Sequence, residues 1–169
     1  MPHAMKKLLF FFSLLLVFVS CKLKGEAEST PQLSFSVFEH HHDSVIRILS
    51  AQPLSSGLYL IDTIAVSDTM VFSIGANGVY NGLDSLIVRW DSTAMKATFA
   101  VGSDWGNYID ASKSDIPKGR FHFYPYVSTA VIPMVYVPTK PGKDTLSFHL
   151  ANTSTVFGPV QVTFIQPVR

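Results

Sequence analysis

Hydrophobic and polar residues alternate with a period of two along most of the chain after Leu33. In the segment Thr145–Leu150, Leu146, Phe148 and Leu150 alternate with polar side chains. Successive side chains of a strand point to opposite faces of a sheet, so this spacing predicts a strand packed on one side and solvated on the other. Beyond residue 33 no segment shows the period of an amphipathic helix.

The same alternation predicts strands along the whole of this region. We expect them at Ser34–Phe38, Val45–Leu49, Leu58–Val66, Met70–Ile74, Leu86–Trp90, Lys96–Val101, Phe121–Tyr124, Val131–Val137, Thr145–Leu150 and Val160–Ile165. Turn-forming residues separate them, for example Asn81-Gly82 and Pro141-Gly142. Many short strands without crossover helices are typical of a β-sandwich or barrel, so the sequence predicts an all-β fold.

The end of the chain resembles the last hairpin of an immunoglobulin-like domain. Residues Val137–Ile165 contain a Pro-Gly turn, the strand Thr145–Leu150 and a final strand Val160–Ile165. The resemblance implies an immunoglobulin-like antiparallel β-sandwich, as a single domain over residues 33–169. The sequence lacks the tyrosine corner and the inter-sheet disulfide of antibody-type domains, which favours the broader group of envelope sandwiches. About ten expected strands exceed that fold's usual seven to nine and predict an added hairpin or N-terminal strand.

The N-terminal residues follow a different pattern. Lys6 and Lys7 precede an apolar run of 12 residues, Leu8–Val19. This length fits the roughly 7–15 residues of a signal-peptide core and falls short of the ~20 that a spanning helix needs. We therefore expect residues 1–20 to be a removable secretion signal.

The single cysteine, Cys21, follows this run directly. Val19-Ser20-Cys21 resembles the lipobox of bacterial lipoproteins, with Phe18 where the family usually has Leu. The resemblance implies lipidation of Cys21, cleavage before it, and an acyl chain such as palmitate on the new N-terminus. Several acyl chains hold a protein on a membrane lastingly. The alternative is an ordinary signal peptide that is cleaved elsewhere.

The sequence thus predicts a protein of the bacterial cell envelope, attached to the membrane through an N-terminal lipid anchor. Lys22 follows the cysteine instead of Asp, which resembles the pattern sorted to the outer membrane. Residues 21–32 are small, polar and rich in chain breakers, so we expect a lipidated flexible tether before the domain 33–169.

Chain length and charge indicate the number of domains and which partners to expect. Removal of the first 20 of the 169 residues leaves 149, enough for one domain with one core. Without Lys6 and Lys7, 11 of the 13 basic side chains remain against 12 acidic ones, and they are scattered along the sequence. We therefore expect no nucleic acid as a partner.

A histidine cluster, His40-His41-His42-Asp43, lies between two expected strands. In a strand only His40 and His42 would share a face. The remaining histidines, His122 and His149, belong to separate expected strands, and a zinc site needs three or four converging ligands. We interpret the cluster as a solvated hairpin loop and expect no metal and no cofactor, while metal binding by His40 and His42 stays open.

Residues for catalysis are few. The chain has no Gly-x-Ser-x-Gly elbow, and an acylated Cys21 is no nucleophile. Aspartates occupy several expected loops: Asp91, Asp104, Asp110 and Asp115. We interpret them as turn-formers, with a glycosidase carboxylate pair, or calcium binding by Asp104, Asn107 and Asp110, as alternatives. The sequence favours a protein that is not an enzyme.

Two aromatic pairs are the candidate binding residues: Trp105 with Tyr108, and Tyr124 with Tyr126. Exposed rings beside polar groups stack on sugars or anchor protein contacts. Alternatively, Trp105 and Tyr108 cover one end of the core as a lid. The leading function is a non-enzymatic, lipid-anchored envelope protein that contacts another protein in adhesion, assembly or secretion. Carbohydrate binding is the alternative, and a metal-dependent hydrolase is less favoured.

Overall fold

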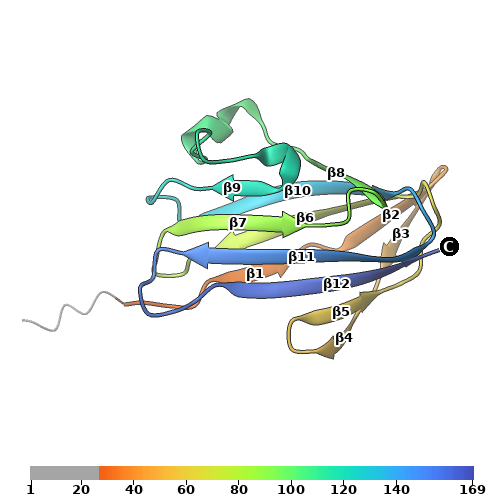
Figure 1. Cartoon of the computed structure of the whole chain (residues 1–169), viewed down its shortest axis with the longest axis horizontal. Helices are drawn as coiled ribbons and strands as arrows, with labels where there is room; N and C mark the ends of the chain where they lie inside the picture. Colours follow the sequence, from red (N-terminus) through yellow and green to blue (C-terminus); the bar gives the residue numbers. More distant parts are fainter. Residues whose placement is uncertain (1–26) are drawn as a thin grey trace, which may run out of the picture.

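Two six-stranded sheets packed face to face make up most of this computed structural model, which describes residues 27–169 (Figure 1). Sheet A contains β1 (Gln32–Phe35), β2 (Phe38–His42), β3 (Val45–Leu49), β6 (Thr69–Asn77), β8 (Met95–Phe99) and β10 (Thr129–Pro138). Sheet B contains β4 (Ala51–Ser55), β5 (Leu58–Ile61), β7 (Leu83–Arg89), β9 (Arg120–His122), β11 (Gly142–Asn152) and β12 (Val160–Val168). The prediction of an all-β fold is confirmed.

Two short 3-10 segments, η2 (Ser103–Asn107) and η3 (Ile116–Lys118), lie between β8 and β9. Within residues 27–169, no helix has the length and apolarity needed to cross a membrane. The expected secretion signal and Cys21 lie outside the described residues.

The strands of sheet A run in the order β3-β2-β6-β10-β8, and β1 also pairs with β6. Those of sheet B run in the order β4-β5-β12-β11-β7-β9. Among the pairs of named strands, β12 with β5 is parallel, whereas the sequence predicted an antiparallel sandwich. No short turn connects β5 to β12, so chain connectivity does not impose an antiparallel orientation on this pair.

Alternation along β11 places its apolar residues in the core, as predicted. Leu146, Phe148 and Leu150 are completely buried between the sheets. The ring centroid of Phe148 lies 4.9 Å from that of Phe35 on β1 and 6.1 Å from that of Phe72 on β6. Edge-on aromatic contacts of this kind add to the burial of apolar area, so Phe148 links the two sheets directly.

Two strands occupy segments without a predicted strand. The histidine cluster belongs to β2, and the turn comes only at Asp43, whose φ is 51°. Interpreting the cluster as a loop was therefore wrong. Its polar side chains are tolerated because they lie near the edge of sheet A, where β3 is the outermost strand. Pro53 lies in β4, the edge strand of sheet B, where a missing N–H costs no ladder hydrogen bond.

The expected strand Leu58–Val66 is shorter in the structure. β5 ends at Ile61, and beyond it Ile64 makes only an isolated bridge to Val168. The segment from 62 to 68 instead connects sheet B to β6 of sheet A. Because the chain passes from sheet B to sheet A here, β5 ends although the apolar residues continue beyond it.

Residues before β1 contact the loop between β11 and β12. The carboxylate of Glu28 accepts hydrogen bonds from Oγ of Ser154 and, over 3.0 Å each, from the backbone N–H groups of Thr155 and Val156. The bond from Ser154 is the main reason why the pKa of Glu28 is lowered. Contacts with the sandwich thus begin inside the segment 21–32 assigned to the tether.

Candidate functional site

The outer face of sheet A carries a row of apolar side chains. In register, Ile48 lies opposite Glu39, Glu39 opposite Val71, and Val71 opposite Val135. Ile46, Ile48 and Val131 are 61%, 59% and 62% exposed. We call Ile46, Ile48, Val71, Val131 and Val135 the apolar face.

β3 lies at the edge of sheet A and is the most exposed part of this surface. Ile46 and Ile48 lie on its outer side, while Val45 on the opposite side is also exposed. Large aliphatic residues on both sides of an edge strand are unusual in a soluble monomer, because the strand's free N–H and C=O groups invite pairing with another chain.

The structure brings the four candidate aromatic residues together at one end of the sandwich. The ring centroids of Trp105 and Tyr108 are 6.3 Å apart, and those of Tyr124 and Tyr126 are 5.6 Å apart and nearly parallel. Two hydrogen bonds join the pairs: the N–H of Tyr124 donates to the carbonyl of Tyr108, and the hydroxyl of Tyr126 donates to the carbonyl of Asn107.

The members of these pairs differ in burial. Trp105 and Tyr124 pack against the core, as a lid would, whereas Tyr108 and Tyr126 are 44% and 71% exposed. A pocket of about 370 Å³ adjoins the first pair and is lined by Asp104, Trp105, Tyr108, Thr129, Ala130 and Val131. An aromatic wall beside a carboxylate and a hydroxyl suits a small polar ligand such as a sugar.

Asp68 joins two residues of the histidine cluster, and sequence reasoning missed it. Nε2 of His40 donates to Oδ2 of Asp68 over 2.6 Å, and Nδ1 of His42 donates to Oδ1 over 2.5 Å. The N–H of Ala65 donates to Oδ2 over 2.8 Å. His41 points to the opposite face of β2, as strand geometry predicts. Asp68 precedes β6 by one residue, and no local pattern links it to histidines 26 and 28 positions earlier.

Hydrogen bonding within the cluster favours the charged forms of Asp68 and His42. Asp68 is only 5% exposed, and its burial opposes ionisation, but hydrogen bonds from His40, Ala65 and His42 lower its pKa below the usual value. The hydrogen bond to Asp68 raises the pKa of His42. A cleft of about 520 Å³ adjoins the cluster, and Arg47 and Arg169 also line it.

The arrangement differs from that of a metal site. Each imidazole is directed at its own oxygen of Asp68, so the carboxylate bridges the two rings instead of sharing one ion with them. Among residues 27–169, no group of three or more His, Cys, Asp or Glu side chains has a geometry that could hold a metal ion.

Two of the loop aspartates, Asp91 and Asp110, accept hydrogen bonds from the backbone of their own turns. Asp91 accepts a hydrogen bond from the N–H of Thr93, and Asp110 accepts one from the N–H of Ser112. Oδ2 of Asp110 also lies 3.3 Å from Nζ of Lys113. Because its carboxylate already has these partners, Asp110 is poorly placed to bind calcium with Asp104 and Asn107.

A buried polar group lies between the sheets, and the alternation did not reveal it. The hydroxyl of Tyr136 donates to Oε1 of Gln166 over 2.7 Å, and Nε2 of Gln166 donates to the carbonyl of Asp62 over 2.5 Å. Asp144 is also buried, and its Oδ2 has no hydrogen-bond partner within the described residues. Burial raises the pKa of Asp144. Neither Tyr136 nor Asp144 lines the pocket beside Trp105 or the cleft beside Asp68, so we assign this group a structural role.

Comparisons with known proteins leave the family open. No family model matches the chain, and no curated protein matches it. A solved structure named BspA_C_mut aligns with 82% of this chain and 47% of its own, at 10% identity and a TM-score of 0.44. A family 123 glycoside hydrolase from Clostridium perfringens aligns with 83% of this chain and 27% of its own, at 8% identity and a TM-score of 0.41. This chain spans less than half of either protein, and likenesses this low carry no argument about its activity.

Proposed function

We propose that this protein is a non-enzymatic, lipid-anchored protein of the bacterial envelope, in the outer membrane, and that its apolar face binds another protein. The observation that carries the proposal is the exposure of Ile46 and Ile48 on the edge strand β3. Burying such side chains is worth about 25 cal/mol per Å² of apolar surface, so a partner that covers them gains binding energy from each.

The chemistry of this surface indicates what kind of partner it fits. Apolar side chains extend from β3 through Val71 to Val135, with Glu39 as the charged residue of that row. The free edge of β3 offers backbone hydrogen bonds to an added strand. The partner therefore presents an extended segment with apolar side chains at alternate positions, which pairs with β3 and lies against Ile46 and Ile48.

The proposed envelope location rests on the resemblance of Val19-Ser20-Cys21 to a lipobox. The apolar face supports the proposed protein contact and gives no information about location. The immunoglobulin-like character of the sandwich is likewise part of the proposal. Its support is the final hairpin of β11 and β12, which pair in register from Gly142 to Leu150. The hairpins β2–β3 and β4–β5 then represent additions to such a domain.

The test is crosslinking in cells that make the tagged full-length chain, followed by mass spectrometry. A photoreactive residue replaces Glu39, in the centre of the row, and the double variant Ile46→Ser with Ile48→Ser is compared with the otherwise unchanged chain. We expect one envelope protein to be captured, and its capture to be lost in the double variant. Cys21→Ala serves as the unanchored form, in which we expect capture to fall.

Val156→Ser is the matched control, because Val156 is an exposed aliphatic residue in the loop after β11, outside the apolar face. Capture that survives the double variant, or that is lost equally in the control, contradicts binding through the apolar face.

A second candidate function is glycan binding at the pocket beside Trp105. The observation in its favour is the exposed ring of Tyr108, which adjoins Asp104 and Thr129 in one pocket. Binding of neutral oligosaccharides on a glycan array, lost on Tyr108→Ala and kept on Val156→Ser, would support it. If no neutral oligosaccharide on the array binds, glycan binding at this pocket is contradicted.

A further inference from the structure

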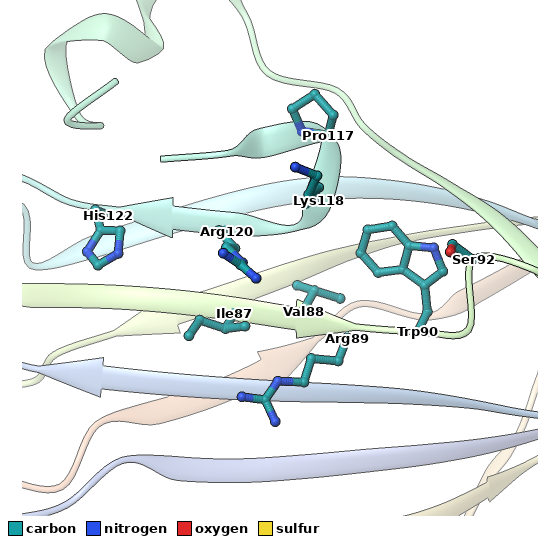
Figure 2. A pocket seen from close by; sticks show the side chains of 9 residues that line it. All are labelled: Ile87, Val88, Arg89, Trp90, Ser92, Pro117, Lys118, Arg120 and His122. Carbon is teal, nitrogen blue, oxygen red and sulfur yellow. The ribbon is translucent and has the colours of Figure 1, made fainter. Parts of the chain in front are cut away.

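A groove lies along the edge of sheet B that β7 and β9 form, on the side remote from sheet A. It has a volume of about 670 Å³ and is lined by Ile87, Val88, Arg89, Trp90, Ser92, Pro117, Lys118, Arg120 and His122. Figure 2 shows these side chains along β7, β9 and the turn of η3 that precedes β9. The groove is separate from the apolar face, which belongs to the other sheet.

The charged side chains that line the groove are all basic. They are Arg89, Lys118 and Arg120, His122 lies beside them in the lining, and no acidic residue lines the groove. Of these four, Lys118 alone forms an ion pair within residues 27–169, with Asp115 at 2.9 Å. The pKa of Asp115 is lowered mainly by Lys118 and also by Arg120. Among the described residues, the guanidinium groups of Arg89 and Arg120 have no ion-pair partner within 4.0 Å, although Arg120 lies near enough to Asp115 to act on its pKa.

Strand pairing explains how these residues meet. Arg120 of β9 lies opposite Ile87 of β7, and Ile87 lies opposite His149 of β11. Arg89 is two positions along β7 from Ile87, so it shares the outer side with Arg120 and is its diagonal neighbour. Diagonal Cα atoms in an antiparallel pair are about 7–8 Å apart, within reach of two long side chains.

The positive charge of Arg89 also acts on a histidine of the neighbouring strand β11. His149 has its pKa lowered, chiefly by burial and then by Arg89.

Trp90 forms one wall of the groove and is held in place. Its ring packs against Phe99, with centroids 5.9 Å apart. Gly119 lies beside it with a φ of 68°, and a Cβ at this position would come within 2.7 Å of Cζ3 of Trp90 and 2.6 Å of the Val88 carbonyl. A residue without a side chain is therefore required for the ring to lie here.

We propose that this groove binds an acidic oligosaccharide, in which successive sugars carry carboxylate or sulfate groups. Two guanidinium groups on adjacent strands, neither of them ion-paired within residues 27–169, suit a ligand with repeated negative charges better than a single ion. The volume exceeds what one small anion fills. The indole of Trp90 and the hydroxyl of Ser92 provide an apolar surface and a hydrogen-bond partner, the two features that sugar rings require.

The test is isothermal titration calorimetry with the full-length chain in detergent micelles. The probes are a heparin tetrasaccharide, which carries sulfate, tetragalacturonate, which carries only carboxylates, and the neutral maltotetraose. We expect at least one acidic probe to bind and maltotetraose not to bind in this groove. Binding of the sulfated probe alone or of the uronate alone identifies the source of the charge.

The variants are Arg89→Gln and Arg120→Gln, and each is expected to weaken binding about tenfold or more, because it removes charge-assisted hydrogen bonds. Arg47→Gln is the matched control, since Arg47 is an exposed arginine on sheet A. Affinity of the unchanged protein should also fall as ionic strength rises to about 0.15 M, a readout that needs no variant.

Absence of binding by both acidic probes overturns the proposal, and so does an equal loss of affinity in Arg47→Gln. Equal affinity for a poly-glutamate peptide overturns the assignment to sugars. Failure here leaves partner capture through Ile46 and Ile48 untouched, because that experiment reports on the opposite sheet.

Discussion

Nε2 of His40 lies 2.6 Å from Oδ2 of Asp68, and this hydrogen bond ties β2 to the segment that connects the two sheets. The segment leaves sheet B after Ile61 and enters β6 at Thr69. Asp68 is nearly inaccessible to solvent, so its charge depends on protein partners. The contact thus fixes β2 in place, and with it the hairpin partner β3, which carries Ile46 and Ile48 of the apolar face.

We expect Asp68→Asn to destabilise the protein by about 1–3 kcal/mol, since an amide accepts poorly from two imidazole donors and leaves buried groups unpaired. Urea denaturation followed by circular dichroism measures this. Asp43→Asn is the control, because Asp43 is exposed and asparagine tolerates its positive φ. A midpoint for Asp68→Asn that equals that of the control would show that the carboxylate contributes nothing to stability.

Stability should depend on pH through His42 and Asp68. The pKa of His42 is raised, so its contribution is complete below the usual value of 6.5 and is lost as the pH rises through the folded value. The pKa of Asp68 is lowered, so its contribution is present above the usual 3.8 and is lost as the pH falls through the folded value.

The difference in urea midpoint between the unchanged protein and His42→Gln should accordingly be largest between pH 3.8 and pH 6.5, the usual pKa values of Asp and His. It should shrink toward alkaline pH. A difference that is constant from pH 4 to pH 9 would show that His42 is not linked to Asp68 in solution.

Phe148→Ala should be among the most damaging core substitutions, because Phe148 is fully buried and contacts Phe35 and Phe72 of the opposite sheet. Loss of a buried phenylalanine costs about 3–5 kcal/mol. The comparison is Phe157→Ala, at an exposed ring in the loop before β12, for which we expect little change in thermal midpoint. Similar midpoints for the two variants would contradict a shared core between the sheets.

Acylation of Cys21 is testable by metabolic labelling with an alkyne analogue of palmitate. The natural chain should take up the label and sediment with membranes, whereas Cys21→Ala should do neither, because the thiol is the site of the first lipid transfer in the lipoproteins that the lipobox resembles. Label in the alanine variant would place the acyl group elsewhere.

The all-β class and the core residues of the long strands were accessible from the sequence. β3 has the bounds expected for it, and the inward set of β11 is the one that alternation indicated. β2 was missed because three histidines in a row interrupt the apolar pattern, although a place next to the edge strand β3 makes them tolerable there. The sequence proposed Trp105, Tyr108, Tyr124 and Tyr126 as binding residues, but it did not show which of them are buried.

The sequence by itself determined which side of each long strand faces the core, because alternation is a local property that the hydrophobic effect acts on directly. Tertiary structure alone decided which strands are neighbours. Strand order depends on pairing between segments far apart in the chain, and it brings Asp68 to His40 and gathers Arg89 and Arg120 into one groove. Basic residues that are scattered along the sequence therefore become one charged surface only after the sheets have formed.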